Sequence, residues 1–150
     1  MADDEFKALD DMVIADMRKA YSETVIDHFH NPRNLGEIPN PDGYAKITGP
    51  CGDTMAIWLR VKDNMITDAR FWTDGCGPSV VSGSMVTELT KNRGITDALR
   101  IDQECVLKNL GGLPEDSVHC ALLAANTLKA AIQDYFSLKN EPWKRSFRRF

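Results

Sequence analysis

Three of the four cysteines stand in sequence settings that suit metal binding or sulfur chemistry. Cys51 is followed by a glycine, and Cys76 has a glycine on both sides. Glycine neighbours leave a sulfur uncovered and let a ligand approach the backbone closely. Cys76 also precedes a predicted helix, whose free N–H groups and dipole stabilise a thiolate. Cys120 lies near the start of another predicted helix and, at about 100° per residue, faces away from that helix's apolar side. We therefore predict a centre for metal or sulfur chemistry built from these three thiols.

Two groups that are not cysteines stand beside these thiols. Asp53 lies two residues after Cys51 and offers an oxygen ligand, although an aspartate before a strand is more commonly a turn residue. His119 adjoins Cys120 and offers either an imidazole ligand or an acid–base group. Either group could therefore join the three thiols as a ligand of the same site.

We expect no role in the site for the remaining cysteine or for the other two histidines. Cys105 lies four residues after Ile101 in an amphipathic segment without a neighbouring glycine, so we expect a small core residue. His28 and His30 stand near the predicted end of a helix, and we expect both on the surface.

Alternating hydrophobicity predicts the strands that bring the first two thiols together. The odd positions from Thr54 to Val61 are apolar, which is typical of a half-buried strand. The pair at 63–64 predicts a turn into a returning strand over 65–73, and 44–48 is a weaker third strand. If the hairpin turns at 63–64, Cys51 faces Cys76, with Cβ atoms about 4.5–5.5 Å apart.

Helical patterns surround these strands. Ser22 is a candidate N-cap of a short helix that Asn31 and Pro32 would end. A second helix begins near Pro78 and stops before Gly94, and short helical segments follow over 96–110. A final long helix carries an apolar stripe made of Val118, Leu122, Ala125, Leu128, Ile132 and Phe136. Strands early in the chain and helices late in it indicate the α+β class.

Length and charge limit the possible functions. The 150 residues suffice for one domain, and we predict this domain over 21–138. An acidic N-terminal arm or helix over 1–20 precedes it, and a basic aromatic tail over 139–150 follows.

The net charge of −4 gives no attraction to nucleic acid or anionic lipid. The uncharged stretches are too short for a membrane span, and the acidic start does not fit a signal peptide. We expect a cytoplasmic protein with reduced thiols.

The chain resembles the IscU/NifU-type scaffold proteins of iron-sulfur cluster assembly. The resemblance is carried by a matching N-terminal segment and three cysteine motifs in the right order: Tyr21–His28, Asn31–Asn34, Cys51–Asp53, Gly75–Gly77 and Val118–Ala124. It implies a compact α+β domain, with a three-stranded antiparallel sheet, helices packed on one side and a long C-terminal helix.

The resemblance also implies a function and a ligand set. Cys51, Cys76 and Cys120 would hold a nascent cluster, [2Fe-2S] in preference to [4Fe-4S], with Asp53 and His119 as nearby groups. The protein would be an iron-binding carrier rather than an enzyme. A pyridoxal-phosphate-dependent cysteine desulfurase would deliver sulfur as a persulfide to Cys120, and apo iron-sulfur proteins would accept the finished cluster.

A frataxin-like protein and an Hsp70-type chaperone are further partners of many relatives. Many bacterial relatives bind the chaperone through a Leu-Pro-Pro-Val-Lys segment before the last cysteine. Here the segment over 113–117 reads Leu-Pro-Glu-Asp-Ser, which argues against a dedicated chaperone. The pattern leaves open whether the protein is a monomer or a homodimer.

Three alternative interpretations use the same residues. Zinc could occupy a tetrahedral site in the same fold, made of Cys51, Asp53, Cys76 and either Cys120 or His119. Cys120 could be the nucleophile or sulfur acceptor of a thiol protein, although adjacent helical residues point about 100° apart, which makes His119 an awkward base. Cys51 and Cys76 could instead form a redox pair.

Overall fold

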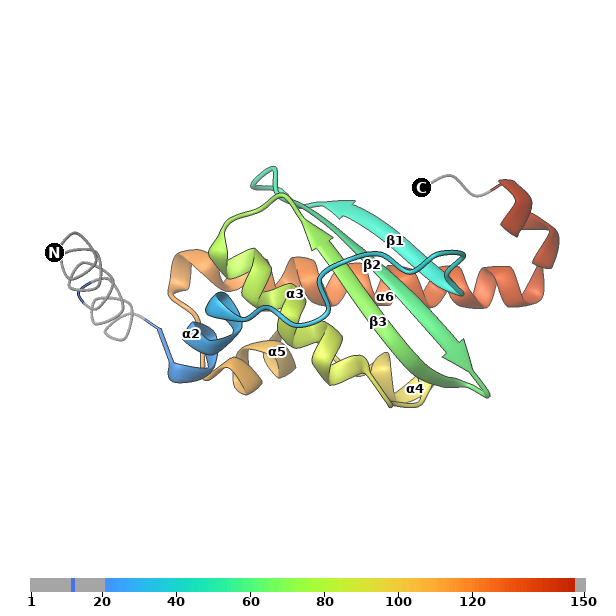
Figure 1. Cartoon of the computed structure of the whole chain (residues 1–150). Helices are drawn as coiled ribbons and strands as arrows, with labels where there is room; N and C mark the ends of the chain where they lie inside the picture. The colour runs from blue at the N-terminus through green and yellow to red at the C-terminus, as the bar shows by residue number, and fades with distance from the viewer. Residues whose placement is uncertain (1–11, 13–20, 148–150) are drawn as a thin grey trace, which may run out of the picture.

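Two layers make up the fold, a three-stranded antiparallel sheet and a set of helices that cover one of its faces (Figure 1). The computed structural model describes Met12 and residues 21–147, so the predicted arm at 1–20 lies almost wholly outside the described residues. The elements, in chain order, are α2 Glu23–His30, β1 Gly43–Thr48, β2 Thr54–Lys62, β3 Met65–Thr73, α3 Gly77–Thr90, α4 Ile95–Ala98, α5 Gln103–Leu110, the 3-10 turn η1 Glu115–Ser117, α6 Val118–Asn140 and η2 Pro142–Phe147. The predicted α+β class and the long C-terminal helix are confirmed.

The sheet has the order β1-β2-β3, and one of its faces supplies much of the core. Met55, Ile57 and Leu59 of β2 are fully buried, as their alternation predicts. The β2–β3 hairpin turns at Asp63 and Asn64, which both have left-handed φ angles of 53° and 62°. The strand predicted from the alternation after Thr54, the returning strand over 65–73 and the weaker third strand are therefore confirmed.

The opposite face of the sheet is partly covered by the chain that leads into β1. Ala56 and Trp58 are buried there against Ile38, and the Tyr44 ring lies 5.2 Å from the Trp58 ring. A strand covered on both faces reads as a nearly continuous apolar run, which explains why Trp58 breaks the alternation of β2.

The register of the hairpin corrects the predicted pairing of the two thiols. Lys62 pairs with Met65, and continuing this register would set Cys51 opposite Cys76. A bulge between Arg60 and Val61 shifts the later pairs by one residue. In addition β2 begins at Thr54, so Cys51 lies in a turn beyond the ladder. The predicted direct opposition of the thiols is wrong.

Helix α2 forms as its caps predict, but one of its histidines is buried. The Ser22 hydroxyl accepts a hydrogen bond from the backbone N–H of Val25 at 3.1 Å, and Asn31 is the C-cap. His28 is only 6% exposed, and its Nδ1 lies 2.7 Å from the Oγ of Ser84 in α3. The expected surface position of His28 is therefore wrong, because α2 packs directly on α3.

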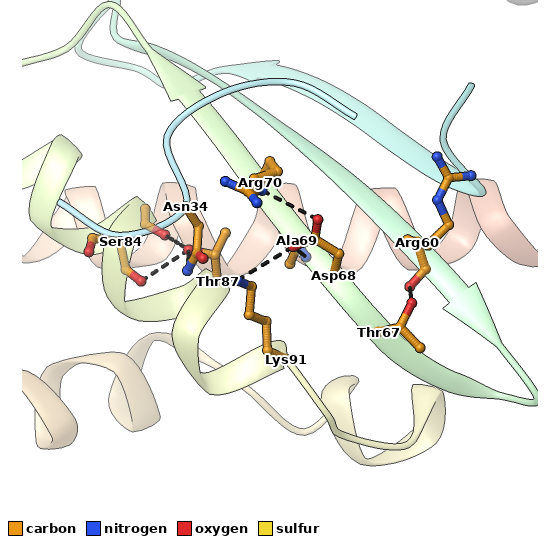
Figure 2. A network of polar contacts seen from close by, with 10 residues as sticks. Asn34, Arg60, Thr67, Asp68, Ala69, Arg70, Ser84, Thr87 and Lys91 are labelled. Carbon is orange, nitrogen blue, oxygen red and sulfur yellow. Dashed lines mark hydrogen bonds and ion pairs between the residues drawn. The ribbon is translucent and has the colours of Figure 1, made fainter. Parts of the chain in front are cut away.

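Polar contacts tie α3 to the loop after α2 and to the sheet (Figure 2). Asn34 Nδ2 donates to Thr87 Oγ1 at 3.1 Å, and the backbone N–H of Arg33 donates to Ser84 Oγ at 2.9 Å. At the other end of the helix, Lys91 Nζ lies 3.5 Å from a carboxylate oxygen of Asp68 in β3. These contacts hold α3, and with it the loop that carries Cys76, against the sheet.

Helix α6 is buried on more than one side, which changes the expected stripe. It packs on β1 and β2 and also against α3 and α5. Leu122 of the predicted stripe is 43% exposed and Val118 is half-buried, whereas Cys120 is 1% exposed. The expectation that Cys120 faces away from the core is therefore wrong. Among the described residues, no helix is apolar enough over a sufficient length to span a membrane.

Candidate metal centre

The beginnings of three elements meet at one end of the molecule. Asp53 directly precedes β2, Cys76 is the N-cap of α3, and Cys120 lies in the first turn of α6. One ligand atom from each residue lies within 4.8 Å of the other two. Cys76 Sγ lies 3.9 Å from Asp53 Oδ2. Two sulfurs and a carboxylate oxygen thus converge as the ligands of one ion or cluster would.

Cys76 is presented to solvent by the start of α3. Its backbone is extended, with φ −72° and ψ −179°, and its side chain makes no capping hydrogen bond to the helix. Pro78 stands in the first turn and favours helix initiation there. The Cys76 thiol is exposed, so a metal or a sulfur donor can reach it from solution.

The two glycines beside Cys76 are required by close packing. A Cβ atom on Gly75 would lie 2.8 Å from Asp53 Oδ2, and one on Gly77 would lie 2.6 Å from a ring carbon of Phe29. Real Cβ atoms essentially never approach other atoms so closely. The glycines therefore allow Asp53 and Phe29 to pack against this loop, in addition to leaving the sulfur accessible.

Asp53 is held in place from two sides. Its backbone carbonyl accepts from the Gly49 N–H at 2.8 Å, which closes the turn before β2. Its Oδ2 accepts from the Ser79 hydroxyl at 3.0 Å. Gly52 within this turn has a φ of 91°, a conformation that side chains other than glycine rarely adopt.

Cys120 is the buried member of the group. Burial raises the pKa of its thiol to about 11, and the nearby Cys76 and Asp53 add to that rise against an opposing hydrogen bond from Ser79. The start of α6 therefore does not stabilise a thiolate at Cys120 in the protein without metal, because loss of solvation outweighs the helix dipole. A bound cation would replace the thiol proton.

The neighbouring histidine does reach the buried thiol. His119 Nε2 lies 3.6 Å from Cys120 Sγ, although the two residues are adjacent in one helix. His119 is half-buried. The expectation that adjacent helical positions keep His119 from contacting the Cys120 thiol is therefore wrong, because Nε2 comes within contact distance of the sulfur.

Cys51 lies outside the group of converging ligands. It is exposed, in the turn closed by the N–H of Gly52 donating to the Gly49 carbonyl at 3.0 Å. Cys51 and His119 line one cavity of about 220 Å³, which Leu122, Leu123 and Asn126 of α6 also line. The structure therefore places Cys51 beside His119 and apart from the convergence of Cys76 with Cys120.

Cys105 has no part in this centre. It lies on α5, is half-buried and packs against the core, as predicted for a small apolar residue. Its Sγ accepts from Asn109 Nδ2 at 3.7 Å. All four cysteines are free thiols.

Ser79 is a site residue that the sequence reasoning missed. It is fully buried, and its Oγ lies 3.0 Å from Asp53 Oδ2, 3.4 Å from Cys120 Sγ and 4.0 Å from Cys76 Sγ. The available signal was its spacing, because residues three apart in a helix share a face and Cys76 caps this one.

Soft sulfur ligands combined with one carboxylate suit iron or zinc.

The chain matches a known family over most of its length. The family model described as NifU-like N terminal domain matches residues 20–142. The iron-sulfur cluster assembly scaffold protein IscU 1 of Archaeoglobus fulgidus is 48% identical over 117 residues, which cover 77% of this chain and 76% of that protein. The IscU scaffold protein of Escherichia coli is 44% identical over 123 residues, covering 79% of this chain and 95% of that protein.

Solved structures share the fold. The N-terminal part of a nitrogen-fixing NifU-like protein from Brucella abortus superimposes with a TM-score of 0.61 at 18% identity, covering 77% of this chain and 94% of that chain. A putative iron-sulfur cluster assembly scaffold protein for the SUF system, from Fervidobacterium islandicum, gives a TM-score of 0.61 at 23% identity, covering 75% and 96%. At these identities the likeness concerns the fold alone.

Proposed function

This chain belongs to the NifU-like N-terminal domain family, and we propose on that premise that it is a scaffold on which iron-sulfur clusters are assembled and then passed to other proteins. The observation that carries the proposal is the convergence of Asp53, Cys76 and Cys120 within 4.8 Å of one another. Relatives named as cluster assembly scaffolds support it. A scaffold of this kind is a carrier, and the cluster is its cargo.

Four side chains are proposed to hold the cargo. Cys76, Cys120 and Asp53 supply the converging ligands, and Cys51 approaches from its exposed turn next to Asp53. His119 is the alternative to Asp53 as the ligand that is not a thiolate, since its Nε2 already lies 3.6 Å from Cys120 Sγ. Three thiolates and one such ligand suit a [2Fe-2S] cluster, in which each iron takes two protein ligands.

The proposed lability of the cluster comes from Asp53. A carboxylate is a harder and weaker ligand for cluster iron than a fourth thiolate. Asp53 is also half-buried, at the open end of the β2–β3 hairpin, where an acceptor protein can approach. The site therefore combines retention by thiolates with one bond that exchanges readily.

Sulfur is proposed to arrive as a persulfide from a cysteine desulfurase. Cys120 accepts it when its thiolate attacks the outer persulfide sulfur, forming a new S–S bond and releasing the desulfurase thiolate. The thiol proton moves to His119 Nε2, which lies 3.6 Å away. This exchange needs a reduced Cys120 thiol, which a reducing compartment such as the cytoplasm maintains.

Anaerobic reconstitution with iron, cysteine and a desulfurase tests the function. The wild type should bind iron with matching acid-labile sulfide and develop visible absorption. Serine variants of Cys51, Cys76 and Cys120 should lose the cluster, whereas the matched control Cys105→Ser should keep it, because Cys105 lies on α5 outside the site. Zinc without sulfide in every preparation would overturn the scaffold function and favour a zinc protein of this fold.

A further inference from the structure

The hydroxyl of Ser79 faces both a carboxylate and a thiol of the proposed cluster site. Its Oγ lies 3.0 Å from Asp53 Oδ2 and 3.4 Å from Cys120 Sγ. A hydroxyl has a single proton, so Ser79 can donate to only one of these two acceptors at a time. The residue itself is fully buried, so water does not compete for that proton.

The other hydroxyls of α3 form hydrogen bonds away from the proposed cluster site. Ser82 donates to the Pro78 carbonyl at 2.7 Å, and Thr87 and Thr90 donate back to helix carbonyls. Ser84 pairs with His28 and accepts from the Arg33 backbone. Such local bonds to the helix or to a neighbouring helix are usual for buried serine and threonine. Among the described hydroxyls of α3, Ser79 alone points at the metal centre.

The packing around Ser79 leaves its hydroxyl little freedom to point elsewhere. A Cβ atom added at Gly75 would lie 2.7 Å from Ser79 Oγ and 2.8 Å from Asp53 Oδ2, so these groups are closely packed. The backbone N–H of Ser79 donates to the Cys76 carbonyl at 3.0 Å, which fixes the serine in the first turn of α3. The hydroxyl is therefore held between the carboxylate and the sulfurs.

We propose that Ser79 is a positioning residue of the cluster site, whose one hydroxyl proton is donated to the Asp53 carboxylate before iron binds and to Cys120 Sγ once that sulfur is a metal-bound thiolate. This inference rests on the proposed scaffold function. The O–H bond of Ser79 rotates and is never broken. The proton that leaves is that of the Cys120 thiol, which passes to solvent as iron takes its place.

The two hydrogen bonds have different consequences. Before loading, the bond from Ser79 orients the Asp53 carboxylate toward Cys76, so the incoming metal meets ligands that are already placed. After loading, a hydrogen bond to the Cys120 sulfur withdraws electron density from the cluster and raises its reduction potential. Iron bound to Asp53 favours this rotation, because it competes with the Ser79 proton for the carboxylate oxygen.

Two variants on one helix test the inference. Ser79→Ala removes the proposed donor, and Ser82→Ala is the matched control, since Ser82 is equally buried but bonds to the Pro78 carbonyl. In the protein without iron, Co²⁺ titration followed by thiolate-to-cobalt absorption should show about tenfold weaker binding for Ser79→Ala than for wild type. Ser82→Ala should bind Co²⁺ as the wild type does.

The reconstituted cluster provides two further readouts. Its reduction potential should move to a more negative value in Ser79→Ala and stay unchanged in Ser82→Ala. In the wild type, transfer to D₂O should shift the Fe–S stretching bands in resonance Raman spectra, and Ser79→Ala should lose part of that shift. The wild-type measurement needs no variant, so the absence of any isotope shift would overturn the Ser79 hydrogen bond even if Ser79→Ala folds poorly.

The outcomes separate this inference from the scaffold function. If the wild type assembles no cluster, the scaffold function fails. If the wild type assembles a cluster, but Ser79→Ala matches Ser82→Ala in cobalt affinity, potential and isotope shift, the role of Ser79 is overturned and the scaffold function stands.

Discussion

Asp53 Oδ2 lies 3.9 Å from Cys76 Sγ at the open end of the β2–β3 hairpin. The bulge between Arg60 and Val61 creates this relationship, because continuing the shifted register brings Asp53 beside Gly75. A carboxylate therefore occupies the position next to Cys76 at which an unbroken hairpin would place a cysteine. A mixed sulfur and oxygen site is the chemical result.

Removing the carboxylate should make the cluster harder to release. With Asp53→Ala, the proposed exchangeable iron–oxygen bond cannot form, and we expect transfer to an apo-ferredoxin to slow on the order of tenfold. Circular dichroism of the acceptor follows the transfer. Asp74→Ala is the control, because Asp74 lies in the adjoining loop and accepts from the Thr54 N–H at 2.8 Å. Equal transfer rates for Asp53→Ala and wild type would contradict the assigned role.

A methyl group at Gly75 should disorganise the centre. Gly75→Ala would force its Cβ atom against Asp53 and Ser79, so either the loop or the carboxylate must move. We expect at least tenfold weaker Co²⁺ binding and a loss of about 1–3 kcal/mol in unfolding free energy, as for other overpacked sites. Gly49→Ala is the control, because its Cβ would meet Leu123 at 3.6 Å and the Asp53 carbonyl oxygen at 3.8 Å, both ordinary contact distances. Unchanged Co²⁺ affinity in Gly75→Ala would show that the ligands are not packed as described.

The buried thiol should react late in a pH titration. Since the pKa of Cys120 is raised to about 11, only about one molecule in a thousand carries the thiolate at pH 8. We expect iodoacetamide to modify Cys120 with a rate that rises up to about pH 11, measured by peptide mass spectrometry on the protein without metal. Unfolding in urea should abolish the difference from an ordinary thiol. A rate that levels off near pH 8.5 in the folded protein would contradict the prediction.

Acid should destabilise the fold partly through His28. Burial lowers the pKa of His28, and the charge of Arg33 lowers it further. A histidine with a lowered folded-state pKa contributes stability above its unfolded value of about 6.5, and that stability is lost as pH falls through the folded-state pKa. The free energy of unfolding, measured with urea, should therefore fall as the pH drops below 6.5. His28→Ala should reduce this loss of stability in acid, called the acid limb below.

His30 provides the comparison for His28. It lies on the same helix but is exposed, so His30→Ala should keep the acid limb of the wild type. His28→Ala should also cost about 1–3 kcal/mol at neutral pH, because Ser84 loses a buried partner. If the unfolding free energy of His28→Ala falls below pH 6.5 as steeply as that of the wild type, other groups cause the effect.

The elements of this fold could be predicted where the signals are local. The Ser22 cap, the proline after Asn31 and the alternation of β2 act within a few residues, and each element appears where expected. The position of Cys51 depended on a bulge at Arg60, for which the strand pattern carries no signal. A shift of one residue changes which side chains face each other at the end of a hairpin.

The candidate site could be predicted by residue type but not by environment. Asp53, Cys76 and Cys120 are brought together, yet Cys120 is buried because α6 packs against α3 and α5 as well as the sheet. Burial from several sides is a property of the packed helices, so a single apolar stripe could not reveal it. Ser79 was missed for a related reason. Its contacts with Asp53 and Cys120 come from other elements of the fold, so the helix sequence alone does not reveal them.

Transfer of a complete cluster tests the central claim most directly. A cluster assembled on the wild-type protein with ⁵⁵Fe should pass to an apo-ferredoxin, and the label should move even when an iron chelator is present in excess. Transfer of label and sulfide together, at a rate above that of free iron and sulfide, is the predicted result. A cluster that stays on the chain, or that reaches the ferredoxin only as iron the chelator can intercept, would contradict the scaffold function.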